Sequence, residues 1–302
     1  VEGFFRIIWI LYAGRSAWFL SRLLLLLPSI LGLLIYAVYE SNMMTGTVNY
    51  GVYIGKFALL AFITGLALDI FSLPMSARAN SYYKKSDVKL IRIGMQGGIR
   101  TQVVWGMYFS MMIILLAKEW ADLLGVRNTS QIPEIFIPGA LSLLFTGLAL
   151  FFGRLLYLMD RKGILFACLG GMNAVYLMTL FLLIQHNQGI LAIIYARLAA
   201  SIVACILFFV FWLKITGLSF QWVHVAVIPS GVGLALELLL FVLERGISPH
   251  LGNVLTMIIC LSLYLFFYLC ALLLLRNFKE DELKIMPGGK FIRTLGTKLH
   301  VF

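Results

Sequence analysis

Five ionisable side chains interrupt long apolar stretches of the sequence, and these are the residues best placed for chemistry: Lys56, Asp69, Arg154, Arg197 and Glu237. A charge in the hydrocarbon of a bilayer costs about 3 kcal/mol unless it is paired, reaches the headgroups or lines a wet cavity. Each of the five therefore indicates either a buried ion pair that fixes helix packing or a charged group that faces a substrate.

The depth of these residues within their apolar stretches suggests two pairs of opposite charge. At about 1.5 Å per helical residue, Arg197 and Glu237 both lie roughly 10 Å inside the outer ends of consecutive predicted spans, so a salt bridge between them is geometrically allowed. Asp69 and Arg154 each lie four residues before the inner end of a predicted span. Lys56 is four residues from an outer end, which is shallow enough for its ammonium group to reach the headgroups.

Conventional catalytic motifs are missing from the sequence. The four histidines lie singly at or beyond predicted span ends, and there is no P-loop, nucleophile elbow or carboxylate cluster. The four cysteines lie inside apolar stretches, without the spacing of a zinc site or the polar surroundings of a redox pair. We therefore expect a protein that is not an enzyme and that uses no metal and no cofactor.

The composition excludes a soluble protein. Of 302 residues, 62% are hydrophobic and only 12% are charged, and the mean hydropathy is +0.97. A helix needs about 20 apolar residues to cross a bilayer, and such stretches recur along the chain. The sequence therefore predicts an all-α polytopic membrane protein with about eight spans: Leu23–Tyr39, Val52–Leu73, Gly98–Ala117, Ile135–Leu158, Gly163–Ile184, Ile190–Leu213, Trp222–Leu243 and Gly252–Leu275.

The net charge of +11 would suggest nucleic acid as the partner of a soluble protein. Here 18 of the 24 Lys and Arg residues fall in alternate connections, while the other side holds only Lys118, Arg127 and Arg245. Because cytoplasmic loops retain Lys and Arg, we expect a multi-pass protein of the cell membrane with both termini in the cytoplasm. Anionic membrane lipids, and not nucleic acid, are the expected partners of these cations.

The positions of charged residues, Pro and Gly along the chain predict four regions. Residues 1–22 form a cytoplasmic or interfacial segment, residues 23–213 a six-helix transmembrane lobe, residues 214–275 two additional transmembrane helices, and residues 276–302 a basic cytoplasmic tail. The longest connections are Ser76–Gly97 on the inner side and Lys118–Glu134 on the outer side, which leaves no room for an extramembrane catalytic domain.

Two stretches of sequence resemble a known family of transporters. The stretch LPMSARANSYYKKSD (residues 73–87) resembles the end of a helix, the turn and the short charged helix that open the inner loop in the second lobe of MOP-superfamily flippases. The tail EDELKIMPGGK (residues 280–290) is similar to the ending of the stage V sporulation protein B branch, a relative of the lipid II flippases.

This resemblance implies two six-helix lobes that alternate access to the two leaflets and move a polyprenyl-diphosphate-linked oligosaccharide or cell-wall precursor outward. Eight spans would be the second lobe plus two extra helices. The chain begins with Val1, and we expect a missing amino-terminal lobe, or a second copy, to supply the opposing wall. Arg154 and Arg197, with Arg15 or Arg22, would contact the diphosphate by charge-assisted hydrogen bonds.

Three other functions stay open at this point. One is an ion-coupled drug or small-molecule antiporter of the same superfamily, with Asp69 or Glu237 carrying the coupling ion. Another is a membrane glycan polymerase or ligase, although that chemistry usually needs a longer outer loop than Lys118–Glu134. The last is a membrane scaffold without transport activity.

The first prediction concerns orientation and follows from the asymmetry of Lys and Arg. A single cysteine at Ser86, in a background lacking Cys168, Cys205, Cys260 and Cys270, should react with a permeant thiol reagent in intact cells and should not react with an impermeant one. Labelling from outside by the impermeant reagent would invert the topology and the direction of transport.

Overall fold

The computed structural model describes residues 20, 24, 27, 48–84, 88–123, 132–186, 191–217, 221–247, 252–278, 283 and 289–298, and these contain helices and no strand. The elements are α2 (Val48–Lys84), α3 (Val88–Leu115), α4 (Ala117–Leu123), α5 (Ile132–Leu158), α6 (Lys162–Gln185), α7 (Leu191–Thr216), a π-helical turn η1 (Val223–Val227), α8 (Ile228–Ile247), α9 (Asn253–Leu274) and α11 (Gly289–Lys298).

Six helices in the described part of the chain are long and apolar enough to cross a membrane: Leu90–Leu115, Glu134–Leu158, Lys162–Gln185, Leu191–Thr216, Val223–Gly246 and Asn253–Leu274. The predicted all-α fold is therefore confirmed. The number of eight spans stays a prediction, because Leu23–Tyr39 lies outside the described residues except for Leu24 and Leu27, and Val52–Leu73 is one part of the longer helix α2.

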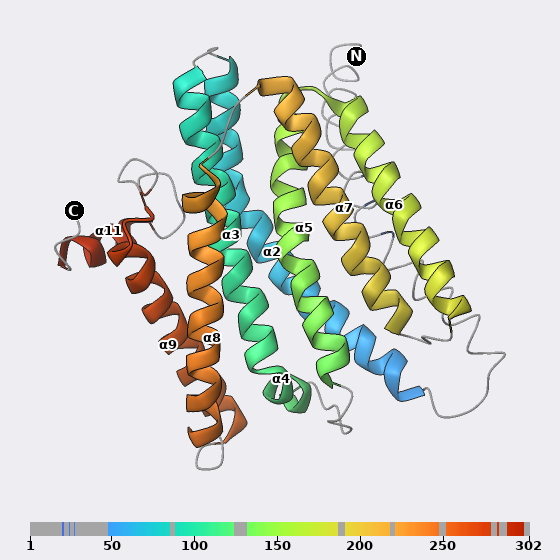
Figure 1. Ribbon diagram of the computed structural model, residues 1–302, viewed down its shortest axis with the longest axis vertical. Coiled ribbons are helices and arrows are strands. Elements are labelled where there is room, and N and C mark those ends of the chain that lie inside the picture. The colour runs from blue at the N-terminus through green and yellow to red at the C-terminus, as the bar shows by residue number, and fades with distance from the viewer. Residues whose placement is uncertain are drawn as a thin grey trace, which may run out of the picture.

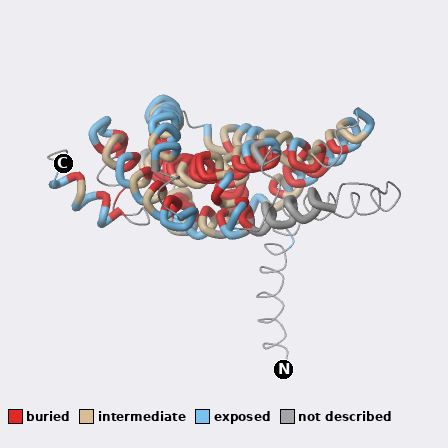
Figure 2. Tube along the Cα trace, turned by 90° about the horizontal axis from the view of Figure 1, so that it is seen from below, coloured by how far each residue is buried: buried red, intermediate tan, exposed pale blue. Residues whose placement is uncertain are grey.

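The helices pack in a row, with a central group of three (Figure 1). Helices α2, α3 and α5 all contact one another; α7 packs against α5 and α6 against α7 on one side, while α8 packs against α3 and α9 against α8 on the other. Figure 2 shows the buried residues gathered along the middle of this body. The apolar part of α3, in the central group, is 78% buried, and that of α5 is 67% buried, whereas the spans on either side are 22% to 39% buried.

Glycines let the central helices approach closely. A Cβ atom at Gly98 of α3 would fall on the ring of Phe151 of α5, and one at Gly106 would lie 2.7 Å from a methyl carbon of Leu144. In a bilayer, van der Waals contact between backbones replaces much of the hydrophobic drive that joins helices in water, so small residues are favoured at such contacts. The contact between α3 and α5 therefore depends on these glycines.

Most of the predicted inner connection Ser76–Gly97 is helical and continues the two helices that it joins. Helix α2 continues through Pro74 to Lys84, and α3 begins at Val88. The charged Arg78 and Arg92 are exposed, while Met75, Ala79, Ile91 and Met95 are buried. Arg78 and Arg92 therefore lie on the polar face of an amphipathic helical hairpin.

Two tyrosines of α9 hold the beginning of α8. The Tyr264 hydroxyl donates a hydrogen bond to the Gly233 carbonyl (3.2 Å), and the Tyr268 hydroxyl donates one to the Pro229 carbonyl (3.1 Å). Pro229 follows the π-helical turn and lacks the N–H that would continue an α-helical ladder. The turn closes instead with a bond from the Ile228 N–H to the Val223 carbonyl, five residues back.

The connections predicted to be rich in cations lie at one end of the bundle. In Figure 1, α2, α5 and α7 end toward the top of the picture, where α3 and α6 begin, and α4 lies at the opposite end. The alternation predicted from Lys and Arg is thus matched by the path of the chain, while the side of the membrane that each end faces stays a prediction.

The second prediction tests the contact between α3 and α5. Replacing Gly98 by Ala should lower the free energy of unfolding by about 1 to 3 kcal/mol, because the new methyl group displaces the fully buried Phe151 ring. Gly170→Ala on α6 is the control: its Cβ meets open space, and Ala favours a helix over Gly by about 1 kcal/mol. Thermal unfolding in lipid nanodiscs measures both. Equal melting of the Gly98 variant and the wild type would contradict the close contact.

Candidate functional site

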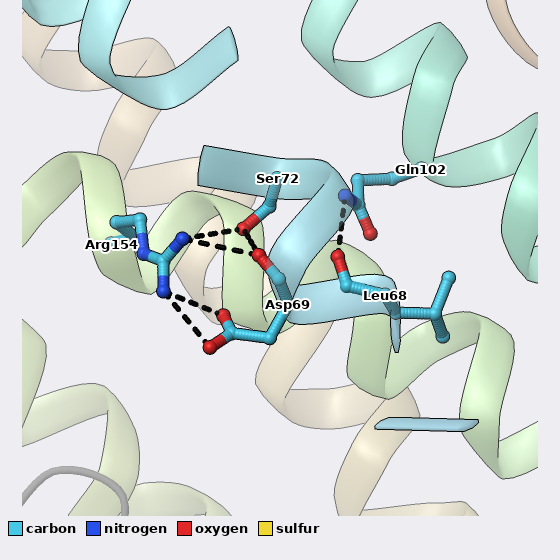
Figure 3. A network of polar contacts seen from close by, with 5 residues as sticks. All are labelled: Leu68, Asp69, Ser72, Gln102 and Arg154. Carbon is cyan, nitrogen blue, oxygen red and sulfur yellow. Dashed lines mark hydrogen bonds and ion pairs between the residues drawn. The ribbon is translucent and has the colours of Figure 1, made fainter. Parts of the chain in front are cut away.

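The guanidinium of Arg154, near the end of α5, contacts α2 (Figure 3). Arg154 Nη2 lies 2.9 Å from each carboxylate oxygen of Asp69. Arg154 Nη1 donates hydrogen bonds to the Asp69 carbonyl (3.1 Å) and to the Ser72 hydroxyl (3.0 Å), and that hydroxyl donates one to the same carbonyl (2.7 Å). Both terminal nitrogens of Arg154 are therefore engaged by α2.

The Arg154–Asp69 cluster is largely removed from solvent. The side chains of Arg154 and Asp69 are 8% and 19% exposed. Pro74, within α2, cannot give a backbone N–H to the Ile70 carbonyl, and just before this break the Leu68 and Asp69 carbonyls accept side-chain hydrogen bonds. The cluster thus joins α2 to α5 at the place where the backbone hydrogen bonds of α2 are interrupted.

Helix α3 is joined to α2 and to α5 by hydrogen bonds from two uncharged side chains. Gln102 Nε2 donates a hydrogen bond to the Leu68 carbonyl of α2 (3.1 Å), as Figure 3 shows. Ser110 Oγ donates one to the Ala140 carbonyl of α5 (2.8 Å). Gln102 and Ser110 are fully buried, so these two bonds give the Gln102 Nε2 and Ser110 Oγ donors a partner away from water and fix α3 against its two neighbours. The Gln102 Oε1 accepts no hydrogen bond from the described residues.

The depth argument predicted the Arg154–Asp69 pair correctly, but the Arg197–Glu237 pair does not form. Arg197 of α7 is half-buried, and among the described residues the nearby titratable group is the Tyr176 phenol of α6, not Glu237. Glu237 of α8 lies near Tyr264 of α9. Helices α7 and α8 stand on opposite sides of the central group, so equal depth does not bring these side chains together.

The other predicted site residues are only partly described. Lys56 belongs to α2, and its side chain lies outside the described part of the chain. Arg15 and Arg22 also lie outside the described residues. No contact of these three cations with the Arg154–Asp69 cluster is therefore established.

Two buried ionisable residues escaped the sequence analysis. Arg100, expected at the inner boundary, is 2% exposed and belongs to the span Leu90–Leu115. Glu119, expected in an outer connection, is 1% exposed on α4. The signal for Arg100 is its position inside the predicted span Gly98–Ala117, whereas nothing in the pattern around Glu119 marks it as buried.

Comparisons with family models, curated proteins and solved structures found no match to the chain. Within the described ranges there is also no group of three or more His, Cys, Asp and Glu side chains that could hold a metal ion. The chemistry of the candidate residues, Arg197 of α7 and the buried Glu119 of α4, therefore has to be argued from their own geometry.

The third prediction concerns the Arg154–Asp69 pair. Arg154→Met should lower the free energy of unfolding by about 3 to 5 kcal/mol, because it leaves the largely buried Asp69 carboxylate without its partner. The double variant Arg154→Met, Asp69→Leu should recover most of this loss, since an apolar pair needs no compensation.

The control breaks an exposed pair near the end of the same helix. Lys162 and Asp160 form an ion pair at 3.2 Å with side chains 44% and 84% exposed, so Lys162→Met should change stability by about 1 kcal/mol or less. Thermal or denaturant unfolding of the four proteins in nanodiscs measures these differences. If Arg154→Met cost no more than Lys162→Met, the Arg154–Asp69 pair would not be a structural fastening.

Proposed function

We propose that the protein is a membrane transporter that moves a lipid-linked oligosaccharide, carried on a polyprenyl diphosphate, from one leaflet to the other. Support comes from the membrane-spanning helices, from the short connections between them, and from the resemblance of residues 73–87 and 280–290 to MOP-superfamily flippases. The observation that carries the proposal is a cation within a span that no described acid neutralises.

That cation is Arg197, on α7. It lies six residues after the start of its helix, which at about 1.5 Å per residue is roughly 9 Å from that end. No ion pair joins Arg197 to an acid among the described residues, and the cost of such a charge in hydrocarbon implies that it faces protein, water or an anionic ligand. A diphosphate supplies the oxygen acceptors that suit the planar guanidinium.

The neighbouring face of α6 provides further polar groups. The Tyr176 hydroxyl of α6 lies near Arg197, is buried and has no hydrogen-bond partner among the described residues. Three residues earlier on the same helix, Asn173 Nδ2 donates to the Leu24 and Leu169 carbonyls, while its Oδ1 accepts no bond from the described residues. A guanidinium and a phenol on two helices that pack together are donors of the kind that phosphate oxygens accept.

Arg154 supports the proposal less than its charge suggested, because Asp69 and Ser72 engage both of its terminal nitrogens. The same contacts weaken the antiporter alternative at Asp69, whose carboxylate is held by Arg154. Glu237, half-buried on α8, keeps that alternative open. Transport by either route needs an opposing wall, from a further lobe or a second copy.

The fourth prediction is that Arg197 contributes to diphosphate binding. With the protein in nanodiscs, Arg197→Ala should weaken binding of a polyprenyl diphosphate by about 10- to 100-fold, the equivalent of one charge-assisted interaction of about 1.5 to 3 kcal/mol. Arg197→Lys should recover only part of the affinity, since an ammonium group lacks the planar fork. Binding is measured by native mass spectrometry or by changes in tryptophan fluorescence.

Two controls separate recognition of the diphosphate from general effects. Lys214→Ala removes an exposed cation from the end of the same helix and should leave affinity unchanged. Binding of the polyprenyl alcohol, which lacks phosphate, should be equal in the wild type and the Arg197 variants. Unchanged diphosphate affinity in a stable Arg197→Ala protein would remove this residue from the site. A lower melting temperature with unchanged affinity would make Arg197 a structural residue.

The transport activity itself needs a separate assay. In proteoliposomes with a fluorescent polyprenyl-diphosphate-linked sugar, flipping raises the fraction of lipid that an impermeant quencher reaches. The wild type, supplied with its opposing wall, should raise this fraction, and Arg197→Ala should not. An equal fraction with and without protein would contradict the proposed function even if the diphosphate binds.

A further inference from the structure

Helix α9 ends among exposed apolar side chains, and the chain turns there. Leu274 and Leu275, the last residue of the helix and its cap, are more than half exposed. Arg276 follows with a positive φ of 50°, and the Asn277 N–H donates a hydrogen bond to the Leu272 carbonyl (2.9 Å), which closes the helix as a Schellman cap. Exposed leucines followed by an exposed arginine indicate the level at which a membrane helix reaches the headgroups.

The chain beyond this turn packs back against the bundle. Phe278 and Leu283 are buried, and α11 contacts α9. A Cβ atom at Gly289 would overlap the Leu283 carbonyl, so α11 begins directly against this backbone. Figure 1 shows α11 beside the end of α9. Helix α11 is therefore held close to the level at which α9 leaves the apolar part of a membrane.

One stripe of α11 packs against the protein. Gly289, Ile292 and Gly296 are spaced by three and four residues and are buried, and Ile292 belongs to the apolar core. Residues three and four apart lie on the same side of a helix. This buried stripe therefore fixes which side of α11 faces away from the bundle.

The opposite side of α11 combines an exposed ring with cations. Phe291, Thr294 and Lys298 share this side through the same spacing, and all three are exposed. We call these three residues the exposed stripe of α11. Phe291 is 63% exposed, Lys290 is exposed next to it, and Arg293 is exposed as well. The ten residues of α11 include no acid, so the exposed stripe offers an apolar ring together with positive charge.

A membrane interface matches both parts of the exposed stripe. In a helix that lies in the interface, an aromatic ring enters the boundary between headgroups and acyl chains, and lysine side chains reach the headgroups around it. A soluble polyanion would meet the lysines but leave the ring in water. Because α9 already places lipid headgroups at this level, anionic lipid fits the position, the charge and the exposed ring of α11.

We propose that the exposed stripe of α11, with Lys290 beside it, binds anionic lipid headgroups at the end of α9 while the Phe291 ring enters the acyl boundary. The buried stripe attaches α11 to the bundle, so the lipid is bound at one place next to α9. Binding at this site is independent of the proposed transport of a lipid-linked sugar.

Quenching of a fluorescent label on the full chain in nanodiscs tests this site. The label is attached to a single cysteine at Thr294, in a background lacking the four native cysteines, and the nanodiscs contain a lipid with a nitroxide quencher on its headgroup. Quenching should be stronger in an equal mixture of phosphatidylcholine and phosphatidylglycerol than in phosphatidylcholine alone, since negative headgroups attract the lysines. It should decrease as the salt concentration is raised. Equal quenching in the two lipid compositions would overturn the proposal.

Removing two lysines tests the cations directly. Lys290→Gln with Lys298→Gln should lower the ratio of bound to unbound α11 in the mixed nanodiscs by about fivefold for each lysine. The matched control, Lys84→Gln with Lys214→Gln, removes two exposed lysines from the last turns of α2 and α7, which end together at the top of Figure 1, and should leave quenching unchanged. An equal decrease in both double variants would assign the effect to the overall charge and contradict a site on α11.

The exposed ring has a test of its own. Phe291→Ser should reduce quenching in both lipid compositions, because it removes the apolar contact but keeps the lysines. Quenching that depends on phosphatidylglycerol but is unchanged by Phe291→Ser would contradict entry of the ring into the membrane. If phosphatidylglycerol had no effect while an added oligonucleotide changed the fluorescence through Lys290 and Lys298, the partner would be nucleic acid and the lipid site would be wrong.

Discussion

The arrangement of the bundle depends on one requirement, that a guanidinium and a carboxylate inside an apolar protein must meet. Arg154 and Asp69 come from helices that are separated by 85 positions in the chain, and neither could stay unpaired at its depth without a large cost. Their contact sets the height of α5 against α2. Gln102 and Ser110 tie α3 to both helices through one hydrogen bond each, so the three central helices are held together by buried polar contacts.

The sequence was sufficient for the features that depend on position along a single helix. Five of the six candidate spans begin and end within about three residues of the stretches expected from hydropathy. The Arg154–Asp69 pair followed from depth and opposite charge, because α2 and α5 happen to be neighbours. The same reasoning failed for Arg197 and Glu237. Hydropathy gives the depth of a residue in the membrane, but it does not tell which helices are neighbours.

The burial of Arg100 and Glu119 was missed because charge was read as a sign of exposure. For Arg78 and Arg92 that reading was right, since both are exposed, although the chain that carries them is helical. Glu119 lies just beyond a span, where an acid is ordinarily solvated, yet on α4 it is buried. A single sequence does not reveal which face of so short a helix turns inward. The placement of this buried acid therefore required the three-dimensional structure.

The two tyrosines of α9 have a mechanical consequence. Tyr264 and Tyr268 are spaced by one helical turn, as are the carbonyls of Gly233 and Pro229 that accept their hydrogen bonds. The donors on α9 and the acceptors on α8 thus have the same spacing. A shift of α9 along α8 by less than a full turn would break both bonds at once. The two bonds therefore resist sliding of α9 along α8. A movement of α8 should carry α9 with it, together with α11, which contacts α9.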